Sequence, residues 1–254
     1  MKYQLISGRK FNKALSRFRL KELQSIEFTD EIAPKGVKLK DLSNDKDGSV
    51  VGWMEKDGVY KVSTQVEGQE IIFNEDCKKM FANFLELKEI DFSMIDTTHV
   101  TDMSEMFADC TCLRALYLYT FDTSNVTDMK YMLFDCSSLE HPDLSHLDTS
   151  NVTNMSHMFQ GCYRLISLDL SYFDTSKVTN MSDMFCGCNN IVNVDLSGFD
   201  TSNVTDMSGM FAWCFDLKKI DISYFNTSKA KTMTWMFCGC RALKIPNFVS
   251  NRDN

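Results

Sequence analysis

The sequence predicts an α/β solenoid, in which short parallel strands and short helices repeat along the chain behind a small N-terminal α+β region. Three observations lead to this fold class. A motif recurs every 26 residues over most of the 254-residue chain, two hydrophobic periods alternate within each copy, and the first 75 residues lack the motif. We therefore expect a cap of one helix and a β-hairpin over residues 1–75, and a seven-copy solenoid over residues 76–254.

The 26-residue period is carried by methionine, phenylalanine and cysteine. Phenylalanine follows the recurring methionine except in the third copy, which has Leu133, and cysteine comes four residues after the methionine except in the first copy, which has Phe84. Because no copy contains an insertion, one unit is repeated and its apolar rows are expected to form a continuous buried spine. The rows are Met80, Met106, Met132, Met158, Met184, Met210 and Met236, and Cys110, Cys136, Cys162, Cys188, Cys214 and Cys240.

Each copy combines a strand-like pattern with a helix-like pattern. Residues 165–170 have the L-x-x-L-x-L spacing of leucine-rich repeats, which ends in a short strand. Residues 173–176 predict a turn closed by side-chain hydrogen bonds to the backbone, and residues 178–188 place four apolar side chains on one face of a short helix. Since one copy cannot bury its apolar face alone, the stacked copies predict a solenoid of the leucine-rich-repeat type.

The repeat pattern M-F-x-x-C-x-x-L-x-x-L-x-L-S-x-F-D-T-S-N-V-T-x-M-S stands nearly intact in residues 158–182 and 184–208. It is similar to the BspA-like leucine-rich repeats of bacterial surface proteins, and the resemblance covers residues 26–248. The resemblance implies a solenoid that binds other proteins, without enzymatic residues, on an exported protein. The sequence itself shows no export signal, lipobox or sorting motif, so we expect a cytoplasmic location for the chain as written and the cell surface if a leader was removed.

The N-terminal region predicts a basic helix followed by strands. Residues 9–23 place apolar side chains near helical spacing, which favours an amphipathic helix packed on the repeats over a membrane-surface or nucleic-acid helix. Residues 1–21 hold seven basic residues and no acidic one, so the net charge of -8 leaves -15 for the rest of the chain. Residues 50–55 and 58–64 predict a hairpin, and residues 70–73 predict a further strand over the first repeat.

Cysteine, histidine and apolar patterns do not indicate catalysis, metal binding or a membrane span. Six of the ten cysteines recur with the repeat, as small buried residues do, and the closely spaced pairs lack the C-x-x-C spacing of zinc sites. The four histidines are scattered, and no P-loop, G-x-S-x-G or H-E-x-x-H motif occurs. No apolar run is long enough to cross a bilayer. We expect a non-enzymatic protein without cofactor or metal, whose cysteines are reduced.

An aspartate recurs between the two inward-facing apolar residues of each predicted strand, so its side chain is expected to point away from the core. A Ca²⁺ ion needs six to eight oxygen ligands around one centre, so a hydrogen bond to the neighbouring serine is favoured over a calcium ladder. The field of such a row attracts basic partners. The row consists of Asp91, Asp143, Asp169, Asp195 and Asp221, and Tyr117 interrupts it.

Exposed positions that differ between copies are free for binding, whereas constant positions serve the core. Tyrosine and tryptophan are preferred binding anchors. By analogy with other solenoids, the strand side, predicted to be concave, is favoured over the convex side. The candidate partner-binding residues are Tyr117, Tyr119, His141, Asp143, Asp169, Tyr172, Asp195, Lys219, Asp221 and Tyr224 on the strand side, and Trp213 and Trp235 on the convex side.

These observations predict a non-enzymatic protein-binding module that presents a rigid, acidic solenoid surface to a basic protein partner. Three alternatives stay open. The chain could be an intracellular or phage-borne inhibitor that occludes a host protein or nucleoprotein target, a bacterial cell-surface adhesin-type protein, or a nucleic-acid binder that uses residues 1–21. Self-association through the apolar C-terminal edge of the last repeat is a further hypothesis.

Overall fold

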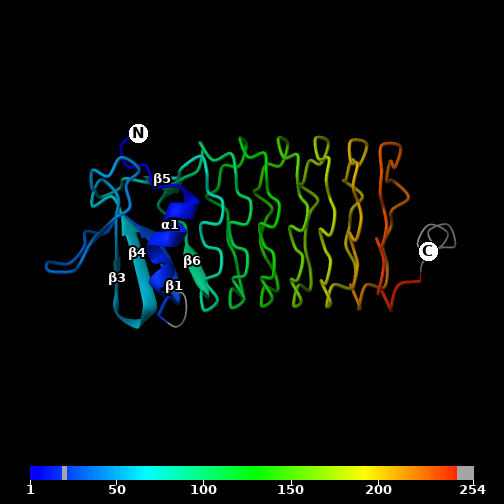
Figure 1. The fold of residues 1–254 in the computed structure, drawn as a ribbon, viewed down its shortest axis with the longest axis horizontal. Helices are drawn as coiled ribbons and strands as arrows, with labels where there is room; N and C mark the ends of the chain where they lie inside the picture. Colours follow the sequence, from blue (N-terminus) through cyan, green and yellow to red (C-terminus); the bar gives the residue numbers. More distant parts are fainter. Residues whose placement is uncertain (19–21, 245–254) are drawn as a thin grey trace.

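The N-terminal cap and the repeats form one row of stacked chain segments, with the N-terminus at the cap and the repeat that precedes residue 244 at the far end (Figure 1). The computed structural model describes residues 1–18 and 22–244. Parallel bridges join residues 26 apart and mark where each repeat begins, at Asp76, Asp102, Asp128, Asn154, Asn180, Asp206 and Thr232. We call the segments that begin at these residues coils 1 to 7.

The cap contains one α-helix and a mixed β-sheet. The five-stranded sheet has the order β2-β3-β4-β1-β6, and a separate pair joins β5 to β7. β1 pairs in parallel with both β4 and β6, so the cap sheet continues directly into coil 1. The elements are α1 (Gly8–Leu15), the 3-10 turns η1 (Ser16–Phe18) and η2 (Lys56–Gly58), and the strands β1 (Ser25–Thr29), β2 (Lys40–Asp41), β3 (Val51–Met54), β4 (Val59–Ser63), β5 (Ile71–Ile72), β6 (Glu89–Asp91) and β7 (Ile95–Asp96).

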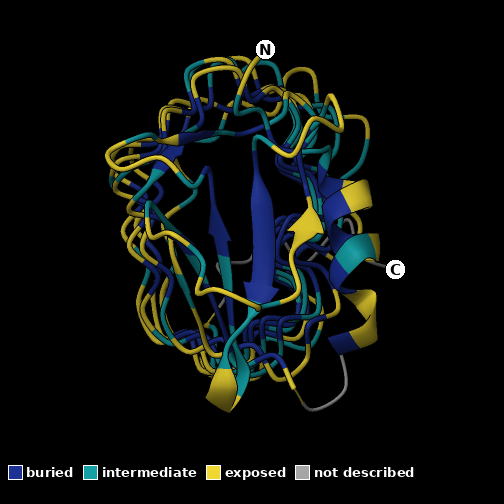
Figure 2. Cartoon of the chain, turned by 90° about the vertical axis from the view of Figure 1, so that its left-hand side faces the viewer, coloured by how far each residue is buried: buried dark blue, intermediate teal, exposed yellow. Residues whose placement is uncertain are grey.

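The helix predicted over residues 9–23 is observed as α1 and η1, and residues 19–21 lie outside the described part of the chain. Phe11 and Leu15 are fully buried, while the basic residues of α1 face outward from the cap (Figure 2). The strands predicted over residues 50–55 and 58–64 form the antiparallel pair β3–β4, whose connection η2 has Asp57 in a left-handed conformation. The helix and the strands β1, β3 and β4 therefore bury apolar side chains in the cap.

The methionine, phenylalanine and cysteine rows lie inside the stack, as the 26-residue period predicts. All seven recurring methionines are at most 1 % exposed. The phenylalanine rings of coils 4 to 7 stack nearly parallel, with centroids 5.2–5.7 Å apart. In the third copy, Leu133 is fully buried in the same row.

The Met-Phe segment of each coil folds as consecutive turns. In coil 2, the backbone N–H of Met106 donates to Met103 and that of Ala108 donates to Glu105, three residues back in each case. The intervening N–H groups of Glu105 and Phe107 instead donate to carbonyls of coil 3, both over 2.9 Å. Residues one before and three after each methionine have positive φ, including Glu105 at 58° and Asp109 at 61°. We call this side of the stack the turn face.

The predicted fold class, an α/β leucine-rich-repeat solenoid with a short helix in each copy, is wrong. Within residues 1–18 and 22–244 the structure has a single short α-helix, α1, and a mixed five-stranded sheet, and the coils hold turns where helices were expected. A helix requires each N–H to bond four residues back with right-handed φ throughout. The left-handed residues break the condition on φ, and the N–H groups that donate to the next coil break the condition on hydrogen bonding. The expected strand in each copy is reduced to β6 and β7 in coil 1 and to isolated parallel bridges beyond it.

Candidate functional site

The recurring aspartates form an exposed column along the side of the stack that β6 begins. In each case the carboxylate oxygen Oδ1 accepts a hydrogen bond from the backbone N–H of the serine two residues further on, over 2.8–3.1 Å. These bonds hold the carboxylates in a fixed place relative to the backbone. We call this set the aspartate column; it consists of Asp91, Asp143, Asp169, Asp195 and Asp221.

The serine bonds also stabilise the charged form of four members of the column. They hold the pKa of Asp143, Asp169, Asp195 and Asp221 below the usual range of an aspartate. A hydrogen bond donated to a carboxylate stabilises its ionised form, so each of these groups is an anion at neutral pH. None of them forms an ion pair with another residue in the described part of the chain.

A second acidic column lies five residues further along the coils and begins in β7, which belongs to the separate two-stranded sheet. Its carboxylates accept the same kind of backbone hydrogen bond from the residue two positions on, over 2.8–2.9 Å. It was interpreted from the sequence as turn chemistry, and its bonds are those of a turn. The second column thus adds a further row of carboxylates to the stack. The second column consists of Asp96, Asp122, Asp148, Asp174 and Asp200.

Tyr117 takes the place of the aspartate in coil 2, and Tyr119 takes the place of the serine that follows it. Their side chains are 58 % and 61 % exposed, and Tyr117 still bridges Asp143 of coil 3. Both rings border a groove of about 720 Å³ between the cap and the first two coils. The groove is lined by Ser25, Ile26, Glu27, Lys88, Glu89, Ile90, Asp91, Phe92, Arg114, Ala115, Tyr117 and Tyr119.

The other candidates on this side are exposed but spread along the stack. Tyr172 and Tyr224 are 65 % and 67 % exposed, two and four coils beyond the groove. His141 Nδ1 lies 2.9 Å from Ser167 Oγ, and Lys219 bridges Asn193 through the backbone. Ten of the twelve residues singled out by sequence thus share one side of the stack, and two of these, Tyr117 and Tyr119, line the groove described above.

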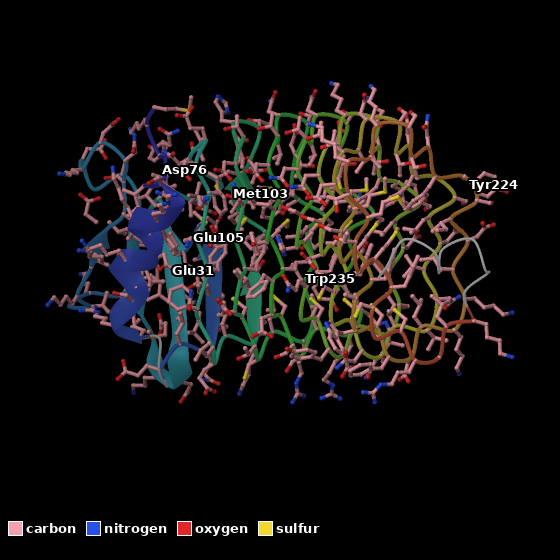
Figure 3. All side chains as sticks on the ribbon, turned by 45° about the vertical axis from the view of Figure 1, so that its right-hand side comes forward. Glu31, Asp76, Met103, Glu105, Tyr224 and Trp235 are labelled. Atoms are coloured by element: carbon pink, nitrogen blue, oxygen red, sulfur yellow. The ribbon has the colours of Figure 1, made fainter. Side chains whose placement is uncertain are left out.

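The two tryptophans lie on the turn face, apart from this set. Both have left-handed backbones, with φ of 61° at Trp213 and 59° at Trp235. The ring of Trp213 lies against Gly239 of the next coil, where a Cβ would come within 2.7 Å of it. Figure 3 shows Trp235 well separated from Tyr224. The tryptophans therefore do not extend the surface made by the tyrosines and aspartates.

A cluster on the turn face brings a histidine, an aspartate and a thiol together. The rings of Tyr131 and His157 stack 4.2 Å apart, and His157 Nδ1 lies 2.7 Å from Gln160 Oε1 and 3.7 Å from Asp183 Oδ2. Burial raises the pKa of the neighbouring Cys186 thiol to about 11. A thiol must be deprotonated to act as a nucleophile, so the cluster lacks an activated one at neutral pH.

The thiols of the cysteine row form hydrogen bonds that link each coil to the one before it. From coil 2 onward, each recurring thiol donates to the backbone carbonyl of the residue 29 positions earlier, over 2.9–3.2 Å. Burial raises the pKa of these thiols, to about 12 for Cys110 and Cys162. The row is therefore neutral and serves the packing of the spine.

These environments predict unequal thiol reactivity. At pH 8, a thiol reagent is expected to modify the exposed Cys238 first in the native protein, and to reach the buried cysteines only after unfolding, when all ten react. Mass spectrometry of the modified peptides over time checks this, with Cys238→Ser as the control that loses the fast phase. Rapid native modification of a buried thiol would contradict the packing described. The buried cysteines are Cys77, Cys110, Cys136, Cys162, Cys188 and Cys214.

Neither a metal centre nor a membrane-spanning helix is found among residues 1–18 and 22–244. No group of three histidine, cysteine or carboxylate side chains converges there to hold an ion. No helix in these residues has the length and apolar character needed to cross a bilayer.

Comparison with known proteins places the coils in a family. A family profile described as "Mycoplasma protein of unknown function, DUF285" matches residues 75–168 and again residues 163–252. The two matches span all seven coils and begin at the boundary between the cap and coil 1. No curated protein and no solved structure matches the chain.

Proposed function

The chain belongs to the DUF285 family, and we propose that it is a non-enzymatic protein-binding module whose aspartate column and neighbouring tyrosines receive a basic protein partner. The observation that carries this proposal is the aspartate column itself. Its carboxylates are exposed, ionised and held by backbone hydrogen bonds, without ion pairs in the described residues. An unpaired row of like charges raises the local concentration of cationic partners and speeds their encounter.

Rigidity supports the same proposal. Each coil is bonded to the next through several backbone hydrogen bonds on the turn face, 2.6–3.1 Å long. A surface that is already ordered loses little conformational entropy when a partner docks. The acidic columns are therefore presented in the arrangement in which they bind.

The contact between His141 and Ser167 on this side of the stack does not have the geometry of a catalytic site. His141 and Ser167 are both exposed to water, and no carboxylate in the described residues bonds the histidine. A serine nucleophile needs a histidine that a third group orients in a water-poor site. The recurring thiols are kept neutral by burial, so this row supplies no alternative nucleophile.

Two biological settings fit this activity. An inhibitor that occludes a host protein and an adhesin-type protein of the cell surface would both use a rigid acidic face, and the second is the setting that the resemblance to BspA-like repeats implies. Fractionation of the native host separates them. The nucleic-acid alternative relies on α1, where Arg9, Lys10 and Lys13 are exposed, but the -15 charge carried by the rest of the chain repels phosphate.

The proposal is tested with a 12-residue peptide of alternating arginine and glycine as the probe. The triple variant Asp143→Asn, Asp169→Asn, Asp195→Asn is expected to lower the association rate constant roughly tenfold at low salt, measured by stopped-flow fluorescence of a labelled peptide. Asparagine keeps the turn, because Asn154 and Asn226 accept the same backbone bond in this chain.

The matched control removes the same three charges elsewhere. Glu67→Gln, Glu86→Gln, Asp216→Asn changes exposed residues outside both acidic columns, and its rate constant should fall by no more than about twofold. Equal losses in both triple variants, or a rate constant that does not change with salt, would show that the aspartate column is not the binding face.

A further inference from the structure

Coil 2 is the exception on the aspartate side of the stack. In the five other coils whose residues at this position are described, an aspartate accepts a backbone hydrogen bond from the serine two residues on. Tyr117 and Tyr119 replace that pair in coil 2, so the bond is given up there. Burial does not explain the replacement, because more than half of each side chain is exposed. The packing of the repeat therefore does not explain why coil 2 has tyrosines at these two positions.

The exception coincides with the groove at the junction of cap and coils. Parallel pairing of β1 with β6 brings Glu27 of the cap beside Asp91 of coil 1, and Ser25 beside Glu89. Ala115 of coil 2 lies in the lining, at a position that carries a larger residue in each other coil. The small residue opens the groove, and the two tyrosines form the wall on the coil 2 side. In sequence, the residues at the position of Ala115 in the other copies are Glu89, His141, Ser167, Asn193, Lys219 and Ile245.

The lining combines aromatic rings with carboxylates. Glu89 and Asp91 have no ion-pair partner in the described residues, whereas Glu27 lies 3.6 Å from Lys61. Aromatic faces attract a planar guanidinium and carboxylates accept its paired N–H groups, so this combination suits arginine better than lysine. Lys88 and Arg114 lie in the same lining, where they can receive the carbonyl oxygens of a bound peptide.

We propose that this groove binds an arginine side chain of the protein partner, stacked on Tyr117 and Tyr119 and paired with Glu89 and Asp91. The inference rests on the proposed function, since the rest of the basic segment then follows the aspartate column from Asp143 onward. Tyr117 bridges Asp143 directly, so the groove and the column are continuous. The tyrosines of coil 2 thus select arginine as the basic side chain that binds in the groove.

The test uses variants that the repeat itself supplies. Tyr117→Asp, Tyr119→Ser gives coil 2 the pair found in the other five coils, so the fold is expected to tolerate it. The probes are the arginine–glycine 12-residue peptide and its lysine–glycine counterpart, titrated into the full chain by calorimetry. We expect the wild-type protein to bind the arginine peptide about tenfold more tightly than the lysine peptide, and the variant to lose this preference.

The variant separates stacking from simple charge attraction. Tyr117→Asp adds a carboxylate, so attraction between charges alone predicts tighter binding of both peptides, whereas the groove proposal predicts weaker binding of the arginine peptide. Tyr163→Ser is the control, because it removes an exposed tyrosine outside the groove and Ser137 occupies that position in coil 3. It should leave the arginine preference unchanged.

The outcomes distinguish the two proposals. If the variant keeps the arginine preference, or the wild-type protein shows none, the groove inference is wrong even when Asp143→Asn, Asp169→Asn, Asp195→Asn still weakens both peptides. If the aspartate variant binds both peptides as the wild-type protein does, the proposed function fails. Circular dichroism of each variant before titration confirms that the fold is intact.

Discussion

Replacing Phe185 with alanine is expected to lower the free energy of unfolding by about 3–5 kcal/mol, since a buried aromatic side chain is lost and a cavity is left. The ring is fully buried and lies between Phe159 and Phe211, at centroid distances of 5.4 and 5.2 Å. The coil backbone is held by its neighbours on both sides, so the cavity cannot easily collapse. Urea unfolding followed by circular dichroism measures the loss.

The third copy provides the control for this prediction. Leu133 occupies the equivalent position and is fully buried. Phe185→Leu is therefore expected to cost much less, about 1 kcal/mol, because leucine fills most of the space in the same row. Similar losses for the alanine and leucine variants would show that the stack does not depend on continuous packing along this row.

Gly8→Ala is expected to destabilise the protein by about 1–3 kcal/mol through overpacking at the start of α1. A Cβ there would lie 2.5 Å from the carbonyl carbon of Cys77 and 2.6 Å from the carbonyl oxygen of Lys78. The backbone N–H of Gly8 donates to Asp76 over 2.7 Å, and the Asn12 side chain donates to Ala82 over 2.8 Å. In later coils the equivalent carbonyls accept hydrogen bonds from the preceding coil. Coil 1 has no preceding coil, so α1 supplies the donors instead.

The control for the glycine prediction is Gly198→Ala. A Cβ at that position would have only the Ser171 carbonyl oxygen nearby, at 3.8 Å, which is an ordinary contact. Its unfolding midpoint in urea should stay within the error of the wild-type value, as surface substitutions usually do. A Gly8→Ala protein that matched Gly198→Ala would mean that α1 does not pack closely on coil 1.

The sequence allowed the interior of the stack to be predicted, but not the local backbone. Regular spacing identifies which residues are buried together, and Met106, Phe107 and Cys110 are indeed fully buried. The same spacing fits a helix or a run of turns, because either places such residues on one side. A signal for turns was present three residues after each methionine, where asparagine, aspartate or glycine, which tolerate positive φ, occurs in every copy except that of Trp213.

The candidate site was predictable only in part. The interruption of the aspartate row at Tyr117 can be read from the sequence, and so can the exposure of the row. The groove could not be predicted, because it depends on the parallel pairing of β1 with β6, two segments more than 60 residues apart. No local pattern around Glu27 indicates that it lies beside Asp91. The available signal in the sequence was that coil 2 has Tyr117 and Tyr119 where other copies have aspartate and serine.

The backbone hydrogen bonds that join the Met-Phe segments run in one direction from coil to coil, from an N–H of the lower-numbered coil to a carbonyl 25 residues later. Every junction between coils therefore uses the same donors and acceptors. Gain or loss of one whole 26-residue unit by gene duplication or deletion would leave all remaining junctions complete, provided that α1 still covers the first. Relatives of this chain can accordingly vary in length in steps of one unit while keeping the tyrosine groove next to the cap.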